Sequence, residues 1–161
     1  GEIFPALEKK AIDATEFSMP AIDERLGFYK IAKYNYYPGW HQQATVFELL
    51  INKDVWNSMS DRQKMVLELT CTAATADAFA MTEAIQPPVM KKNVEERGVT
   101  NMYWSDDMLA KFKGAWDEVE AEQAAKDPFF KKVSEDLKAF REEYKLWQTY
   151  GFLPRPKAPT N

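Results

Sequence analysis

The chain has 161 residues, of which 45% are hydrophobic and 29% charged, a composition typical of a globular protein rather than a disordered one. Its formal net charge of −4 and its scattered basic residues argue against nucleic-acid binding. One cysteine excludes an intramolecular disulfide, and no apolar run approaches the ~20 residues needed to span a bilayer. The length fits one domain with a core of its own, in which Cys71 is expected as a small apolar residue.

Short elements are expected in the first third of the chain. Residues 2–12 carry apolar positions at helical spacing, and residues 14–17 predict a short strand. Residues 20–33 predict a helix broken at Gly27. The run TVFELLIN, residues 45–52, is apolar with little alternation, which is typical of a strand buried on both faces of an α/β sheet.

A long helix is expected to begin at Ser60, which has the sequence of a capping box. We expect it to reach about Ile85 before Pro87 and Pro88 bend or break it. A second helical piece would then end at Gly98, a suitable C-cap. One face of the first piece carries an apolar stripe made of Met65, Leu69, Thr72, Ala76 and Phe79.

The remainder of the chain predicts a short strand or extended link at 99–104 and a helix from 105 onward. Asp127 and Pro128 suit the N-cap and first position of a last helix, and residues 152–161 form a Pro-rich tail that we expect to be extended. The usual interpretation of the last helix's apolar stripe is packing onto the chain's own core. The alternative is that it clasps a partner domain or a second protomer. This C-terminal stripe consists of Phe129, Val133, Leu137, Phe140, Tyr144 and Trp147.

The sequence gives little indication of catalysis. His41 is the only histidine, and the motifs GxSxG, GxGxxG after a strand, GxxxxGK[ST] and HExxH are absent. Acid pairs such as Asp23-Glu24 are sequence neighbours, which do not share a helix face. We therefore predict no catalytic residues, and a hydrolase that uses His41 is the least favoured interpretation.

Two stretches are candidates for a ligand site. Glu16 ends the predicted strand 14–17, where open α/β sheets bind ligands and where oxygen donors suit Na⁺ or Ca²⁺. The alternative is an ordinary solvated acid, the fate of most glutamates. In PGWHQQ, residues 38–43, Trp40 and the amides would supply an apolar wall and directional hydrogen bonds. The commoner role for an isolated tryptophan in such a turn is to plug the edge of the core.

The combination of motifs resembles one family. The chain contains, in order, GEIFPALEKKAIDATEF, a proline turn with LGF, AKYNYYPGW and LLINKDVWNSMS, followed by AAKDPFFKKV and a helix ending in YKLW. This order is similar to that of the periplasmic substrate-binding subunits of TRAP (tripartite ATP-independent periplasmic) transporters, in particular their dicarboxylate and 2-oxo acid branch. The similarity covers almost the whole chain.

The resemblance implies an α/β fold with two lobes around a cleft. Residues 1–161 would be mainly the second lobe with hinge and terminal helices, rich in helix and with a short mixed sheet. Because the chain opens with a helix already under way at Gly1, we expect it to be part of a longer protein. The N-terminal lobe would then belong to the same or a separate chain, and the precursor would carry a signal peptide.

The resemblance also implies the binding residues. Glu16 matches an acid at the cleft, which in some members binds a metal ion, here Na⁺ or Ca²⁺, that bridges to the substrate carboxylate. Phe17 matches an aromatic residue whose backbone carbonyl completes the metal shell and whose ring walls the pocket. Gln42 matches a polar group that faces the ligand, and Trp40 lines or supports the wall. The implied metal ligands are Glu16, the Phe17 carbonyl and Gln42, and the implied substrate contacts are Phe17, Trp40 and Gln42.

The chain departs from the family pattern in several places. Phe17 replaces the usual Trp, Met19 replaces Asn or Gly, and Gln42 replaces a Glu, which removes a negative charge from the cation site. The family's signature arginine, which pairs with the substrate carboxylate in bidentate fashion, belongs to the other half. None of the chain's own arginines stands in a matching motif: Arg25, Arg62, Arg97, Arg141 and Arg155. The chain alone is therefore expected to bind little substrate.

A non-enzymatic transport function follows from the resemblance. The protein would capture a small organic carboxylate, a 2-oxo or hydroxy acid, in the periplasm and close two lobes around it. It would then dock on the TRAP membrane subunits for ion-coupled uptake, with no nucleic-acid partner. The alternative is a helical interaction module that forms a homodimer through the C-terminal stripe. The identity of the carboxylate, and the choice between Na⁺, Ca²⁺ and no metal, stay open.

Overall fold

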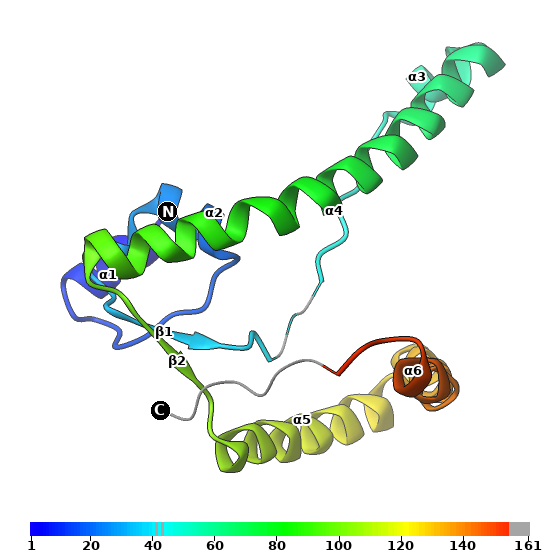
Figure 1. Ribbon diagram of the computed structural model, residues 1–161. Helices are drawn as coiled ribbons and strands as arrows, with labels where there is room; N and C mark the ends of the chain where they lie inside the picture. The colour runs from blue at the N-terminus through cyan, green and yellow to red at the C-terminus, as the bar shows by residue number, and fades with distance from the viewer. Residues whose placement is uncertain (41, 43, 155–161) are drawn as a thin grey trace. The chain divides into compact units, whose positions relative to one another are not determined.

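The computed structural model describes residues 1–40, 42 and 44–154 (Figure 1). The elements in chain order are α1 (Ile3–Glu8), α2 (Pro20–Leu26), a 3-10 turn η1 (Phe28–Lys30), β1 (Tyr34–Tyr37), α3 (Lys53–Ser58), α4 (Asp61–Arg97), β2 (Thr100–Tyr103), α5 (Asp106–Lys126) and α6 (Pro128–Tyr150). The expected helix-rich fold is confirmed. Two compact units divide the chain: unit 1 contains Gly1–Asn35 and Gln42–Asn101, and unit 2 contains Tyr36–His41 and Met102–Asn161.

The chain passes between the two units along β1 and β2, which form a two-stranded sheet. The backbone N–H of Thr100 donates to the carbonyl of Lys33 at 2.8 Å, and that of Trp104 donates to the carbonyl of Tyr37 at 2.9 Å. From the first hydrogen bond to the second, the donor moves four residues forward along β2 and the acceptor moves four residues forward along β1. The two strands are therefore parallel. The predicted strand at 99–104 is thereby confirmed.

Helix ends are where the sequence predicted them from capping chemistry. The Ser60 side chain accepts the backbone N–H of Gln63, whose own side chain accepts the Ser60 N–H at 2.9 Å, which completes the capping box. Asp127 caps α6 through the N–H of Phe129 at 2.8 Å. Gly98 adopts the left-handed conformation (φ +66°) that ends α4 and that other residues rarely adopt.

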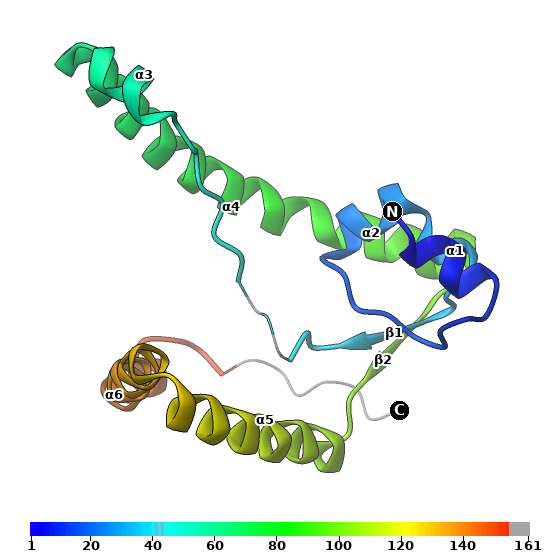
Figure 2. The same ribbon diagram turned by 180° about the vertical axis from the view of Figure 1, so that it is seen from behind.

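The predicted break at Pro87 and Pro88 is wrong, because α4 continues through both prolines as one helix of 37 residues (Figures 1 and 2). A proline nitrogen cannot donate, so two carbonyls of the preceding turn lack their usual helical partner. The packing of α2 against α4 supports the helix at this point. The side-chain carbonyl of Gln86 accepts the backbone N–H of Ala21 at 3.0 Å, directly beside the prolines.

Two predicted strands are absent from the part of the chain that the structure describes. Residues 14–17 form an irregular link between α1 and α2. Residues 45–52 form no strand and are not buried: Val46 is 81% exposed, and Phe47 and Leu50 are each 89% exposed. The physical reason is that a strand requires a neighbouring backbone, and no described segment pairs with either run.

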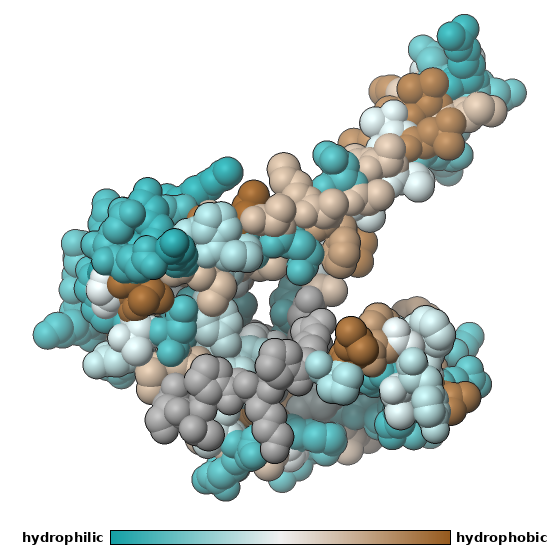
Figure 3. All heavy atoms as spheres, viewed as in Figure 1, coloured by the Kyte–Doolittle hydropathy of each residue, from teal (hydrophilic) through white to brown (hydrophobic). Residues whose placement is uncertain are grey.

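The expected core is also largely absent. Among the described residues, the buried apolar side chains are Ala21, Phe28 and Val99, all in unit 1. Cys71, expected inside a core, is exposed in α4. The C-terminal stripe does not pack onto the chain's own core, since its six side chains are 40–72% exposed. Figure 3 shows hydrophobic side chains on the surface around α3 and the start of α4.

Within the described residues, no helix combines the length and the apolar character needed to cross a membrane.

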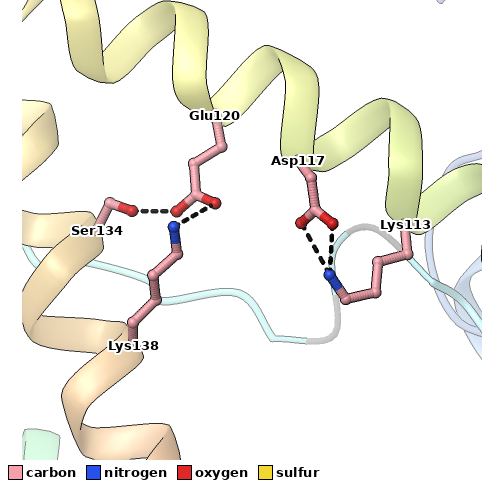
Figure 4. A network of polar contacts seen from close by, with 5 residues as sticks. All are labelled: Lys113, Asp117, Glu120, Ser134 and Lys138. Atoms are coloured by element: carbon pink, nitrogen blue, oxygen red, sulfur yellow. Dashed lines mark hydrogen bonds and ion pairs between the residues drawn. The ribbon is translucent and has the colours of Figure 1, made fainter.

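A buried carboxylate joins the two helices of unit 2 (Figure 4). Glu120 of α5 is 8% exposed, and its carboxylate accepts hydrogen bonds from the Ser134 hydroxyl and from Lys138 Nζ, the latter at 2.9 Å. The hydrogen bond from Ser134, followed by that from Lys138, lowers the pKa of Glu120 below its usual range. Polar contacts rather than apolar burial therefore connect α5 to α6.

Arg97, the last residue of α4, connects three elements of unit 1. Its Nη1 lies 2.6 Å from Glu24 Oε1 of α2, and the two side chains are only 16% and 23% exposed. The guanidinium also donates to Asn93 Oδ1 at 2.9 Å and lies 3.9 Å from the centre of the Tyr29 ring in η1. Next to it, Lys33 Nζ donates to the Arg97 carbonyl at 3.0 Å.

Replacing Arg97 tests this arrangement. Arg97→Ala leaves the partly buried Glu24 carboxylate without its cation and removes a contact with Tyr29, so we expect a loss of about 2 kcal/mol in the free energy of unfolding. Urea denaturation followed by circular dichroism measures it. Arg141→Ala, at an exposed position of α6, should change the value by less than about 0.5 kcal/mol. Equal effects of the two substitutions would contradict the conclusion that Arg97 stabilises unit 1 through Glu24 and Tyr29.

Candidate functional site

The segment between α1 and α2 presents Glu16 and Phe17 at the surface of unit 1. The Phe17 ring packs edge-to-face on Phe28, with 5.9 Å between the ring centres. Phe28 is buried, whereas Phe17 is 46% exposed. Phe17 is therefore anchored on one side and accessible on the other, as a residue that walls a pocket must be.

Asp23 of α2 places a second carboxylate close enough to Glu16 for their charges to interact. Its Oδ1 is buried and has no hydrogen-bond partner among the described residues. Burial is the main cause that raises the pKa of Asp23 to about 6; a hydrogen bond from the Ser18 backbone opposes this rise, and the negative charge of Glu16 adds to it. The two acids create a locally negative environment that a cation or a proton donor would stabilise.

Sequence reasoning missed Asp23, because it considered this residue only as a neighbour of Glu24. The two side chains do diverge, as expected for adjacent helical residues, since Glu24 turns to Arg97. The available signal was the position of Asp23 in the first turn after Pro20, from which an acid commonly reaches back to a preceding N–H.

Gln86 of α4 holds the residues between Phe17 and α2 in place. Its carbonyl oxygen accepts the Ala21 N–H, its nitrogen donates to the Thr82 carbonyl at 3.1 Å, and that nitrogen lies 4.0 Å from the sulfur of Met19. Met19 replaces Asn or Gly in the family pattern. Its sulfur thus contacts the scaffold helix as a weak hydrogen-bond acceptor.

Trp40 belongs to unit 2, where it lies in a group of four aromatic rings. It stacks on Phe112 of α5, with ring centres 4.5 Å apart and planes 10° apart. Trp104 packs edge-on against Phe112 at 5.1 Å and stacks on Tyr36 at 4.5 Å. This environment is compatible with both interpretations of Trp40, a supporting wall or a plug.

Gln42 is exposed, belongs to unit 1, and donates from Nε2 to the Thr45 hydroxyl at 3.0 Å. His41 and Gln43 lie outside the described residues. The structure thus brings Glu16, Phe17 and Asp23 together, and it gives no contact between them and Gln42. The described residues contain no group of three or more His, Cys, Asp or Glu side chains that could hold a metal ion.

Comparisons with known proteins identify the family. Residues 1–127 match the model of the bacterial extracellular solute-binding proteins of family 7. The chain belongs to this family. The resemblance to TRAP substrate-binding subunits inferred from the motifs is therefore confirmed.

Relatives of this family 7 chain cover it almost completely. It is 32% identical over 153 residues to the monocarboxylate 2-oxoacid-binding periplasmic protein of Nostoc sp. PCC 7120. This alignment covers 95% of this chain and 42% of the Nostoc protein.

Two solved structures are similar as well. One is a TRAP transporter solute-binding protein of Bordetella bronchiseptica RB50, crystallised as a mixed-occupancy dimer with calcium and picolinate in one active site, with a TM-score of 0.82 and 27% identity. The other is a TRAP periplasmic solute-binding protein of Pseudoalteromonas atlantica T6c with bound sodium and pyruvate, with a TM-score of 0.82 and 28% identity. They cover 94% and 93% of this chain, which spans 45% and 46% of theirs. The family 7 chain thus spans less than half the length of these relatives.

The raised pKa of Asp23 predicts a pH-dependent stability. Because the folded-state pKa of about 6 exceeds the usual 3.8, the contribution of Asp23 is most favourable below the lower value and is lost as the pH rises through the higher one. At pH 7.5, Asp23→Asn should raise the free energy of unfolding by about 1 kcal/mol, a value reduced by the partial exposure of this residue. Urea denaturation at pH 5 and pH 7.5 measures the effect.

Glu16→Gln provides the companion variant for that measurement. It should stabilise the chain at pH 7.5 in the same direction but by less, because the charge of Glu16 is a smaller cause of the shift than burial. A loss of stability in Asp23→Asn at pH 7.5 would show that the ionised carboxylate of Asp23 has a stabilising partner. The raised pKa assigned to Asp23 would then be wrong.

Proposed function

We propose that this chain is the second half of a periplasmic solute-binding protein that captures a small organic carboxylate for a TRAP transporter. Membership of the solute-binding family carries the proposal. The family is one of solute-binding proteins rather than of enzymes, and the Nostoc relative is named for 2-oxo acids. The site around Glu16 and Phe17 agrees with this role, since it combines an accessible ring with an excess of negative charge.

The cation of this site would be held by oxygen atoms. Glu16 and the unpaired Oδ1 of Asp23 are hard donors of the kind that Na⁺ and Ca²⁺ prefer, and the Phe17 carbonyl and Gln42 would add neutral oxygens. The similar structures contain calcium with picolinate in one case and sodium with pyruvate in the other. A bound cation would supply the positive charge that lets a substrate carboxylate approach two protein carboxylates.

The chain's own residues would orient the ligand rather than transform it. The Phe17 ring, fixed by Phe28, would exclude water from one side of the ligand, and the Gln42 amide would provide directional hydrogen bonds. Contacts from both lobes would favour the closed state, which the membrane subunits would recognise. We expect none of the arginines of this chain to replace the family's carboxylate-binding arginine, because none stands in a matching motif. Arg97, in particular, already pairs with Glu24.

A chimera tests this proposal. The first half of the Nostoc relative, joined to residues 1–161 of this chain, would form a complete cleft. We expect the chimera to bind a 2-oxo acid such as pyruvate in isothermal titration calorimetry, and Glu16→Gln to weaken binding by about tenfold or more, because it removes a charged donor from the cation site. Glu8→Gln, at an exposed position of α1, is the matched control and should leave affinity unchanged.

The possible results separate the function from the site. If the chimera fails to bind any 2-oxo acid while the complete Nostoc protein binds one under the same conditions, the proposed function is wrong. If the chimera binds and Glu16→Gln leaves the affinity intact, the function stands and the assignment of Glu16 is wrong.

A second proposal concerns assembly through α6. The C-terminal stripe is exposed along the whole helix, and the Bordetella relative crystallised as a dimer. Two stripes packed against each other would cover the apolar and aromatic surface that remains exposed on α6, as in an isologous interface. We propose that α6 forms a homodimer.

Substitutions on α6 test the homodimer. Phe140 lies in the C-terminal stripe, whereas the neighbouring Ala139 lies outside it, so Phe140→Lys and Ala139→Lys add the same charge on different faces. Multi-angle light scattering should give twice the chain mass for the wild type and for Ala139→Lys, and a single chain mass for Phe140→Lys. A monomeric wild type, or two variants that behave alike, would contradict the proposal.

A further inference from the structure

Four aromatic side chains of unit 2 form a connected group, the aromatic cluster, made of Tyr36, Trp40, Trp104 and Phe112. Tyr36 stacks on Trp104, which packs edge-on against Phe112. Phe112 in turn stacks on Trp40. The first and last rings of this series come from the same stretch of chain, since Tyr36 lies in β1 and Trp40 in the turn that follows it. The cluster therefore joins that stretch to the end of β2 and to α5.

Backbone contacts hold the elements that carry the cluster. The N–H of Trp104 donates to the Tyr37 carbonyl at 2.9 Å, which keeps the end of β2 beside β1. Helix α5 begins directly afterwards (Figure 1), and the Ser105 side chain caps it by accepting the N–H of Met108 at 3.2 Å. Phe112 lies one turn further along, on the same helix face as Met108. Its ring is thus placed by a helix that starts beside the cluster.

The aromatic cluster does not close the edge of a core. Trp40, Trp104 and Phe112 are each half-buried, and Tyr36 is 43% exposed. Among the described residues of unit 2, no apolar side chain is buried. A tryptophan that plugs a core requires a core behind it, and the described part of unit 2 does not provide one. These observations favour the interpretation of Trp40 as a wall over that of a plug.

The stack with Phe112 fixes the plane of the Trp40 indole. The two ring planes are 10° apart and their centres 4.5 Å apart, so the indole cannot turn about its side-chain bonds without losing this contact. A stacked ring covers one face of its neighbour, and Trp40 as a whole stays partly exposed. A flat organic acid that meets such a wall finds its plane already set. The entropy of ordering the indole is then lost on folding rather than on binding.

We propose that Phe112 is a positioning residue of the ligand site, which sets the plane of Trp40 before a ligand binds. Trp40 contacts the substrate, and Phe112 acts through it from α5. Trp104 braces Phe112 from the end of β2. This inference rests on the proposed function and deepens it, because it gives a role at the same site to a helical residue that the sequence motifs did not indicate.

The first test measures affinity in the chimera of the Nostoc first half and residues 1–161, with pyruvate as the probe. Phe112→Leu removes the ring and keeps an apolar side chain, so we expect isothermal titration calorimetry to show binding about fivefold weaker. Phe112→Tyr keeps a ring and should bind within about twofold of the wild type. Phe130→Leu makes the same substitution in α6, outside the aromatic cluster, and should also stay within about twofold.

A second variant without a ring keeps the test independent of how well Phe112→Leu folds. Phe112→Met has a flexible side chain that adapts to the space left by the ring. It should weaken pyruvate binding by the same factor as Phe112→Leu. Circular dichroism of each chimera shows that the folded state is the one titrated.

Fluorine NMR of protein labelled with fluorotryptophan follows the indole itself. The chain has five tryptophans, and the resonance that is absent from Trp40→Phe belongs to Trp40. Nuclei above an aromatic face are shielded, so this resonance should lie upfield in the wild type. It should move downfield in Phe112→Leu and stay in place in Phe130→Leu. A role of Phe112 in stability alone, without the stack, would lower the free energy of unfolding and leave this resonance unmoved.

The remaining outcomes overturn the inference in distinguishable ways. If the wild-type chimera binds pyruvate and Phe112→Leu binds it equally well, the proposed function stands and the role of Phe112 is wrong. The same conclusion follows if Phe112→Leu and Phe130→Leu weaken binding alike, or if the Trp40 resonance is the same in Phe112→Leu and the wild type. If the wild-type chimera binds no 2-oxo acid while the complete Nostoc protein does, the proposed function is wrong and this inference falls with it.

Discussion

The ion pair between Arg97 and Glu24 is the contact on which the arrangement of unit 1 depends. It lies at the point where α4 ends, α2 packs and η1 turns, and it is shielded from water on most sides. With α2 fixed in this way, the short link that precedes it is fixed as well. That link carries Glu16 and Phe17 and leads to Asp23. A partly buried salt bridge far along the sequence therefore determines where the candidate ligand groups are.

Local chemistry made much of the secondary structure predictable. The capping box at Ser60, the glycine end at Gly98 and the Asp127-Pro128 start each involve groups within a few residues of one another, and each is confirmed. The failures concern long-range partners. The predicted strands and the burial of Cys71 and the C-terminal stripe all required a neighbouring surface that the described residues do not provide. Pro87 and Pro88 failed as breakers for the opposite reason, because α2 supports the helix there.

The candidate site could be predicted only in part. Glu16, Phe17, Trp40 and Gln42 came from resemblance to a family, since spacing alone left each with an ordinary structural role. Asp23 was not predicted as a site residue, because its raised pKa depends on burial and on the nearby Glu16, and a helical sequence pattern reveals neither. The structure connects Glu16, Phe17 and Asp23 within unit 1, while Trp40 belongs to unit 2. The role of Gln42 as a ligand stays a prediction.

The exposed run at residues 45–51 has a further consequence for the tendency of the chain to aggregate. A short segment of high β-propensity with one charge and no proline is the type that pairs with copies of itself in aggregates. Glu48 is the only charged side chain in it and so acts as a gatekeeper against that reaction. A polypeptide that covers the run would protect the chain from aggregation in addition to completing its fold.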